Sequence, residues 1–259
     1  MATNTTGTVV PLAVQKQRNL RASTAFSWLG QGWRDLWTTP GPSLAYGSAV
    51  FLVSLAIIWG LFKFELDYIL FPALAGFMVV GPLIALGLYE KSRAIETGQP
   101  VSLGKMLYVN AASGPQVLFT GAILCLLMLV WMRAAVLIYA LFFGLVAFPG
   151  FNHIVQMLIT TPEGWGMLIV GTTVGGLFAA FSFAISVFAV PMLLDENTDA
   201  FTAMGTSISL VWNNLPVMLM WGLIVLALFL VSLATALIGL IIVFPLLGHA
   251  TWHAYRAIK

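Results

Sequence analysis

The last apolar block of the chain restricts its fold more than any other feature. No Asp, Glu, Lys or Arg occurs between Ala200 and Tyr255, and the run from Pro216 to Gly248 is almost wholly apolar. A helix that spans a bilayer needs roughly 20 apolar residues, so this run is too long for one straight span and about long enough for two. The block therefore predicts a helical hairpin inside a membrane.

The composition extends this prediction to the whole chain. Of the 259 residues, 60% are hydrophobic and 8% are charged, whereas a soluble domain carries about 25% charged residues. The apolar runs are continuous and do not alternate, which favours helices over the strands of a barrel. A net charge of +2 without a basic block excludes a nucleic-acid-binding surface. The lipid bilayer is therefore the expected surrounding of most of the chain.

Hydropathy divides the chain into a polar arm at 1–22 and a single integral membrane domain at 23–259. We expect the domain to be an all-α, polytopic helical bundle of about six transmembrane helices in three hairpins. The stretch 136–161 is interpreted as the tail of the third span plus a surface-lying segment, because Pro149-Gly150 and Asn152-His153 interrupt it. The expected spans are about 43–62, 68–89, 115–135 and 165–194, with two more inside 215–248 that turn near 232–235.

A surface helix is expected before each hairpin. Two stretches, 23–37 and 200–212, carry apolar residues at the same helical offsets, which is typical of amphipathic helices that lie in the membrane interface. A further such helix is expected at 103–110, and 90–105 is expected to be a loop. The first stripe consists of Phe26, Leu29, Trp33, Leu36 and Trp37, with Asp35 facing elsewhere.

Prolines recur at matching places in the three hairpins. Pro40, Pro115 and Pro216 mark the junctions after the surface helices, and Pro82, Pro191 and Pro245 interrupt the second helix of each hairpin. Three similar helix-hairpin units would explain this pattern. Because prolines are common in membrane helices, chance recurrence stays open as the alternative.

The basic residues predict the orientation. With six spans, nine of the 11 Lys and Arg residues fall on the side that holds both chain termini. Cytoplasmic segments are the ones enriched in Lys and Arg. We therefore expect a multi-pass protein of a bacterial inner membrane with cytoplasmic N- and C-termini and with cytoplasmic interfacial helices.

Two histidines near the C-terminus are the first candidates for chemistry. His249 and His253 are four residues apart and share one helical face, a spacing that can hold a metal. No Asp, Glu or Cys nearby in the sequence completes such a site, so we expect no metal and no cofactor. The alternative is that His249 hydrogen-bonds inside the bundle while His253 lies among the headgroups with Arg256.

Two other charged residues are candidates for a polar, ion-binding or partner site. Asp195 follows Pro191 by four residues, as His249 follows Pro245, and a proline frees backbone carbonyls that can bind an ion. Arg133 is embedded in an apolar segment, and an intramembrane charge is a functional candidate. The alternative for Arg133 is that its side chain reaches the outer interface beside Trp131.

Three stretches together carry a family resemblance. They are Phe183 to Asp195, the string MLMWG at 218–222, and the most specific one, GHATWHAYR at 248–256. From about Trp28 onward the chain resembles a family of predicted bacterial integral membrane proteins with a domain of unknown function, whose members are sometimes labelled cytochrome c oxidase subunit I. The resemblance implies fold and location but no activity. The catalytic oxidase subunit needs more histidine ligands than the three present here.

Three classes of function remain, in order of preference. The first is a non-catalytic accessory, assembly or scaffold component of a membrane complex, such as a respiratory complex, with a membrane-protein partner. The second is a small transporter or channel that uses the proline-broken helices. The third is a haem- or metal-binding redox component. No catalytic constellation is recognisable, so an enzyme is not expected, and the oligomeric state stays undetermined.

Overall fold

The computed structural model describes residues 19–144 and 148–259, and for residues 151 and 152 the backbone alone. Most of the expected polar arm therefore lies outside the described residues. The described part is all-helical, as predicted. Its elements are α1 (Thr24–Trp37), α2 (Pro40–Lys63), η1 (Asp67–Ile69), α3 (Leu70–Ile84), α4 (Leu86–Glu96), α5 (Leu103–Leu107), α6 (Gly114–Phe143), α7 (Phe151–Thr160), α8 (Pro162–Ser186), α9 (Ala189–Asp195), α10 (Ala200–Asn213), α11 (Leu215–Ala234) and α12 (Leu240–Ile258).

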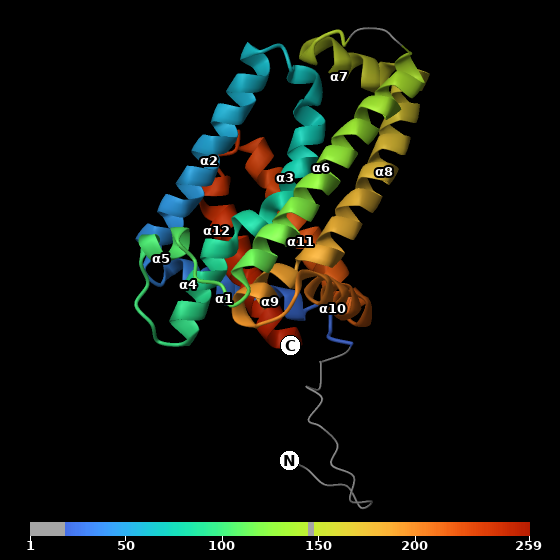
Figure 1. Ribbon diagram of the computed structural model, residues 1–259. Coiled ribbons are helices and arrows are strands. Elements are labelled where there is room, and N and C mark those ends of the chain that lie inside the picture. The colour runs from blue at the N-terminus through green and yellow to red at the C-terminus, as the bar shows by residue number, and fades with distance from the viewer. Residues whose placement is uncertain (1–18, 145–147) are drawn as a thin grey trace, which may run out of the picture.

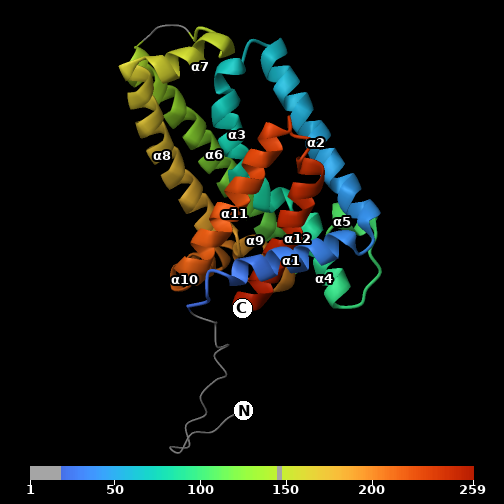
Figure 2. The ribbon, with the colours of Figure 1, turned by 180° about the vertical axis from the view of Figure 1, so that it is seen from behind.

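The helices form an upright bundle with two different ends (Figure 1). Helices α1, α4, α5, α9 and α10 gather at one end together with Asn19 and Lys259, and we call this the terminal end. Helix α7 lies across the opposite end, which we call the loop end. Helices α2, α6 and α8 are the longest described helices, and α3 reaches the terminal end through α4, whereas the turn between α11 and α12 stops short of the loop end (Figure 2).

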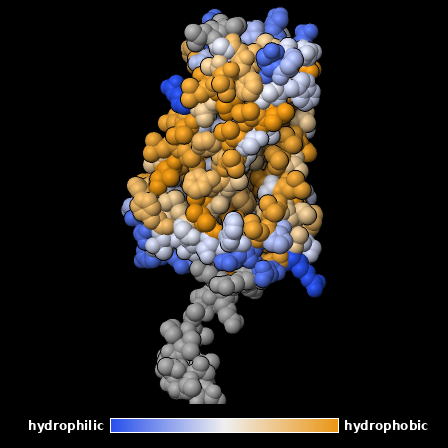
Figure 3. Space-filling model, turned by 90° about the vertical axis from the view of Figure 1, so that its right-hand side faces the viewer, coloured by the Kyte–Doolittle hydropathy of each residue, from blue (hydrophilic) through white to orange (hydrophobic). Residues whose placement is uncertain are grey.

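The prediction of a polytopic helical bundle is confirmed. Within the described residues, five helices are long and apolar enough to cross a membrane. On the face that Figure 3 shows, an apolar belt lies between two polar rims, and only 11% of the apolar window of α2 is buried by other parts of the protein. The five segments are Pro40–Lys63, Asp67–Glu96, Gly114–Phe143, Pro162–Asp195 and Leu215–Ala234.

The sixth expected span, α12, is not among these five segments. It pairs with α11 in the expected hairpin, but its second half contains His249, His253 and Arg256 and is packed inside the terminal end. The preceding turn also lies later than the expected 232–235, because α11 continues to Ala234. The turn is tight, and the buried Leu237 adopts a left-handed φ of 68° there.

The surface helices agree with the expectation only in part. α1 buries Ala25, Trp28 and Leu36, but Phe26 and Trp33 of the predicted stripe are about half exposed, at 56% and 47%. A helix that lies in the membrane interface can pack one apolar face on the protein and turn another toward lipid. α10 lies at the expected place, whereas the helix expected at 103–110 is the short α5.

The expectation that 90–105 forms a loop is wrong for 90–96, which belong to α4. α4 continues to Glu96 because Lys91 and Ser92 are buried at 1% exposure, and their side chains bond inside the protein. The order of elements is the one expected for three related units. α2, α6 and α11 each carry a proline at their start, and Pro82, Pro191 and Pro245 lie in α3, α9 and α12.

Candidate functional site

Hydrogen-bonded polar side chains, which we call the polar chain, join α1, α2, α4 and α12 at the terminal end. The polar chain begins at the buried Lys91, whose ammonium donates to Ser43 Oγ at 2.7 Å. The same ammonium donates to the carbonyl oxygens of Thr39 at 3.0 Å and Leu36 at 3.5 Å. An ammonium group has three donors and no acceptor. All three donors of Lys91 are therefore engaged, and they tie α4 to the junction between α1 and α2.

The polar chain continues through His249, which is 0% exposed. Its Nε2 lies 2.8 Å from Ser43 Oγ, and its Nδ1 lies 2.9 Å from Ser92 Oγ. Ser92 donates to Asp35 Oδ2 at 2.6 Å. Asp35 Oδ2 also lies 2.8 Å from Nε2 of the partly exposed His253.

The hydrogen-bond directions form one consistent order. Lys91 can only donate, so Ser43 accepts from it and gives its own proton to Nε2 of His249. Nδ1 of His249 then carries the proton that is donated to Ser92. His249 is neutral in this order, and both of its nitrogens are occupied by serine hydroxyls. Neither nitrogen is left to bind a metal or a haem iron.

Electrostatics agree with a neutral His249 and an ionised Asp35. Burial, together with the nearby Lys91 charge, lowers the pKa of His249 to about 3. Burial alone would raise the pKa of Asp35, but hydrogen bonds from His253 and Ser92 outweigh it and hold that pKa below its usual value. The site therefore holds an ammonium and a carboxylate that are connected through a neutral imidazole.

Local sequence explains how these groups meet. His249 and His253 lie one turn apart on α12, and Lys91 and Ser92 point in different directions from adjacent positions of α4. Gly32 of α1 permits the close approach of α12, because a Cβ on it would lie 2.7 Å from the Cβ of Ala250. This contact carries Asp35 to the face of α12 that bears both histidines.

An ionic cluster lies beside the polar chain. Tyr255 Oη donates to Asp195 at 3.1 Å and to Glu196 at 2.9 Å. Lys259 pairs with the same two carboxylates, at 2.8 Å and 2.7 Å. Arg256 pairs with Glu96 at 2.8 Å and lies 3.5 Å from Asp195. These contacts fix the C-terminal turn of α12 to the ends of α4 and α9.

The structure places the five predicted residues in three groups. His249 and His253 belong to the polar chain, and Asp195 and Arg256 belong to the ionic cluster. Arg133 lies apart on α6, where its side chain is exposed and the described residues offer it no ion pair. Beside it, Trp131 points inward and donates to the carbonyl of Pro72 at 3.1 Å.

Sequence reasoning missed Asp35, Ser43, Lys91 and Ser92. One available signal was that Asp35 is the only acidic residue before Glu65, and it lies on a Trp-rich helix. Lys91 and Ser92 gave no such signal, because a lysine after an apolar run is the usual end of a span. Their burial depends on α1 and α12, which are distant in the sequence.

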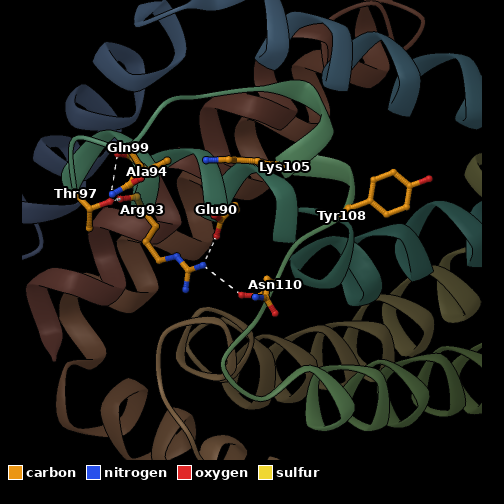
Figure 4. Close-up of a pocket in the computed structure, with 8 residues that line it drawn as sticks. All are labelled: Glu90, Arg93, Ala94, Thr97, Gln99, Lys105, Tyr108 and Asn110. Carbon is orange, nitrogen blue, oxygen red and sulfur yellow. Dashed lines mark hydrogen bonds and ion pairs between the residues drawn. The ribbon is translucent and has the colours of Figure 1, made fainter.

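Two cavities lie elsewhere, and neither is lined by the polar chain. One is a polar pocket of about 480 Å³ beside α4 and α5. In it Arg93 points to Glu90 and Asn110, while the ring of Tyr108 points away from the other labelled residues (Figure 4). The other is an apolar cavity of about 1190 Å³ among α3, α6, α8 and α11.

The pair Ser43–His249 has the spacing of a nucleophile and its base, but Ser43 is 0% exposed. A substrate has no access to it in this arrangement. Among the described residues, no three His, Cys, Asp or Glu side chains gather as a metal site. Chemically, the polar chain can hold helices together and conduct a proton along its hydrogen bonds.

Comparison with known proteins gives one match. No curated protein and no solved structure matches the chain. The match is to a family model and covers 70–195, a segment that contains Lys91, Ser92 and Asp195 and ends before the string GHATWHAYR. Residues 70–195, from α3 to α9, match the family described as predicted integral membrane protein (DUF2189), which confirms the expected resemblance to membrane proteins with a domain of unknown function.

Proposed function

We propose that the protein is a non-catalytic scaffold or accessory component of a membrane complex, with its terminal end as the docking platform. The observation that carries this proposal is the closed polar chain from Lys91 to Asp35. Each of its groups bonds to another group of the protein, and the central ones are buried. Such a network fixes one arrangement of the helices.

The platform is proposed to face the cytoplasm of a bacterial cell. Seven described basic residues lie on helices or segments of the terminal end, which fits the enrichment of Lys and Arg on the cytoplasmic side. At the loop end Lys63 packs on Trp59 at the end of α2. The seven are Arg21, Arg34, Lys91, Arg93, Lys105, Arg256 and Lys259.

Photocrosslinking in intact membranes tests the proposal. A photoreactive amino acid is placed at Gln31 on α1 or at Asn197 after α9, both exposed at the terminal end, and at the exposed Glu163 of the loop end as the matched control. We expect one membrane protein to crosslink at the first two positions and not at Glu163. The same protein should co-purify stoichiometrically in mild detergent. A protein that purifies alone and gives no crosslinked band would contradict the proposal.

The visible spectrum of the same purified protein tests the redox alternative. The scaffold proposal predicts a colourless preparation. A Soret band that belongs to this chain would overturn it in favour of a haem-binding component.

A second candidate is a small proton transporter, and the order of the hydrogen bonds favours it. Lys91 can pass a proton to Ser43, Ser43 can pass its own to Nε2 of His249, and the Nδ1 proton can move through Ser92 to Asp35. This shift neutralises both end charges and reverses the imidazole tautomer. Liposomes with an internal pH dye test it, comparing wild type with His249→Ala and with the exposed His153→Ala. Proton flux lost only in His249→Ala would favour transport, and absence of flux in all three would exclude it.

A further inference from the structure

The apolar cavity of about 1190 Å³ lies inside the membrane-spanning part of the bundle. It is larger than most small-molecule pockets, which enclose roughly 300–1,000 Å³. Its walls are α3, α6, α8 and α11. Tyr68 and Tyr139 border it near the loop end, and Trp212 borders it near the terminal end. The hollow therefore extends along much of the apolar belt.

Three glycines leave open space along the walls of this cavity. A Cβ added to Gly171 or Gly176 of α8, or to Gly222 of α11, would meet nothing within 4 Å. Gly175 is different, because a Cβ there would lie 2.7 Å from the ring of Trp131. Packing explains Gly175 but not the other three, although glycine is among the poorest helix formers. Gly171, Gly176 and Gly222 therefore add open volume to the cavity that they line.

We propose that the cavity binds the acyl chains of a membrane phospholipid. The surroundings of α3, α6, α8 and α11 are hydrocarbon, so lipid chains are the apolar molecules that reach the cavity. Water would find few polar partners on its walls, and an empty cavity would forfeit the dispersion contacts of its lining. Tyr68 and Tyr139 mark the rim where the headgroup leaves the cavity, because tyrosine favours the headgroup level.

A transmembrane helix of a partner or of a second copy fits this cavity less well. α7 borders the cavity with Ile154 and Leu158, and α10 borders it with Val211 and Trp212. These two helices lie at opposite ends of the bundle (Figure 1). A helix that spans the whole bilayer would run into them, whereas lipid chains end within the hydrocarbon layer.

Labelling with a photoreactive lipid tests the proposal. The full chain is purified in mild detergent and incubated with phosphatidylethanolamine that carries a diazirine in one acyl chain. The test variant is Gly171→Leu/Gly176→Leu, because a Cβ at either position meets nothing within 4 Å and both positions line the cavity. The matched control is Gly60→Leu on α2, which also has open space at its Cβ but does not line the cavity.

We expect wild type and Gly60→Leu to be labelled on peptides of α8 and α11, saturably and in competition with unlabelled phosphatidylethanolamine. In the double variant this labelling should fall by about tenfold, because the leucines displace methylenes from the wall. Equal labelling of all three proteins, or labelling that does not saturate, would show annular lipid only and overturn the proposal.

Native mass spectrometry supplies a readout that does not depend on the double variant. Wild type should carry about one phospholipid per chain after gel filtration, in keeping with one cavity of this size. A lipid-free monomer would overturn the proposal. A lipid-free dimer, crosslinked through a photoreactive amino acid at Gly171, would assign the cavity to a second copy instead.

Discussion

Asp35 Oδ2 lies 2.8 Å from Nε2 of His253, although 218 residues separate the two in the sequence. This contact joins the first described helix to the last one, and it lies next to the bonds of His249 to Ser92 and Ser43, which reach α4 and α2. The first and last surface-lying parts of the chain therefore form one unit. A change in this unit should affect the whole terminal end.

Asp35→Asn should destabilise the folded protein. The substitution removes the charge that receives hydrogen bonds from Ser92 and His253. Hydrogen bonds to charged groups contribute about 1.5–3 kcal/mol each, so we expect a loss of about 2 kcal/mol. Thermal unfolding followed by gel filtration of the detergent-solubilised protein measures it. The exposed Glu163→Gln serves as the control, and equal melting temperatures of the two variants would contradict the role of Asp35.

Lys91→Met should cost more than Asp35→Asn. Methionine fills similar space, but the carbonyls of Leu36 and Thr39 and the Ser43 hydroxyl lose their donor. Each buried group left without a partner costs about 1–3 kcal/mol, so a loss of about 3–4 kcal/mol is expected. The matched control is Lys105→Met, because Lys105 is exposed on α5. If both lysine variants unfold at the same temperature, the network does not stabilise the junction of α1 and α2.

Stability should depend on pH through His249. Its pKa is lowered to about 3 in the folded protein, whereas an unperturbed histidine titrates near pH 6.5. Between these values the unfolded chain binds a proton that the folded one does not. The free energy of unfolding is therefore not reduced by His249 above about pH 6.5. As pH falls from there toward 3, it decreases by up to about 1.4 kcal/mol per pH unit.

Replacement of His249 tests this dependence. Denaturant unfolding between pH 7 and pH 5 should show a smaller loss of stability in His249→Gln than in wild type. His153→Gln, at an exposed position of α7, should keep the wild-type dependence. An unchanged slope in His249→Gln would mean that other groups dominate the acid response.

The sequence predicted the parts of the fold that depend on local patterns. Continuous apolar runs and their proline-marked ends located the long helices, because span length and backbone geometry are local properties. The polar second half of α12 did not prevent the prediction of a sixth full span, since hydropathy does not reveal packing. The hairpin turn was placed early because Leu237 in a left-handed conformation gives no signal in the sequence.

Only part of the candidate site, its two histidines, was predicted from the sequence. Spacing singled out His249 and His253, but their partners lie on three other helices. The burial of Asp35 was not predicted, because the exposed apolar residues Phe26 and Trp33 dominate the helical pattern of α1. In a membrane protein an apolar stripe can face lipid, so it does not identify the buried face. Only the close approach of α1 and α12 brings the site together.

Arg133→Leu should leave the fold almost unaffected. The side chain is exposed on α6 and has no ion pair among the described residues, in keeping with an arginine that reaches the interface. We expect a change in unfolding free energy within about 0.5 kcal/mol. Unfolding of the detergent-solubilised variant beside wild type measures it, and a loss of several kcal/mol would mean that Arg133 pairs inside the bundle.

Gly32→Val should separate α1 from α12. A Cβ at this position would lie 2.7 Å from the Cβ of Ala250, and the nearest backbone atoms of Ala250 are equally close. The helices must move apart, which lengthens the Asp35–His253 contact, and overpacking of this kind costs about 1–3 kcal/mol. Gly30→Val is the matched control, because nothing lies within 4 Å of its Cβ position on the same helix.

Labelling of a cysteine introduced at Ser92 reports this separation. Ser92 is 1% exposed beneath α1, and the native Cys125 is first replaced by Ala. A membrane-impermeant maleimide should modify Ser92→Cys readily in the Gly32→Val protein and slowly in the Gly30→Val protein. Equal modification rates would mean that α1 is held by contacts other than its close approach to α12, and that Gly32 has no special part in forming the site.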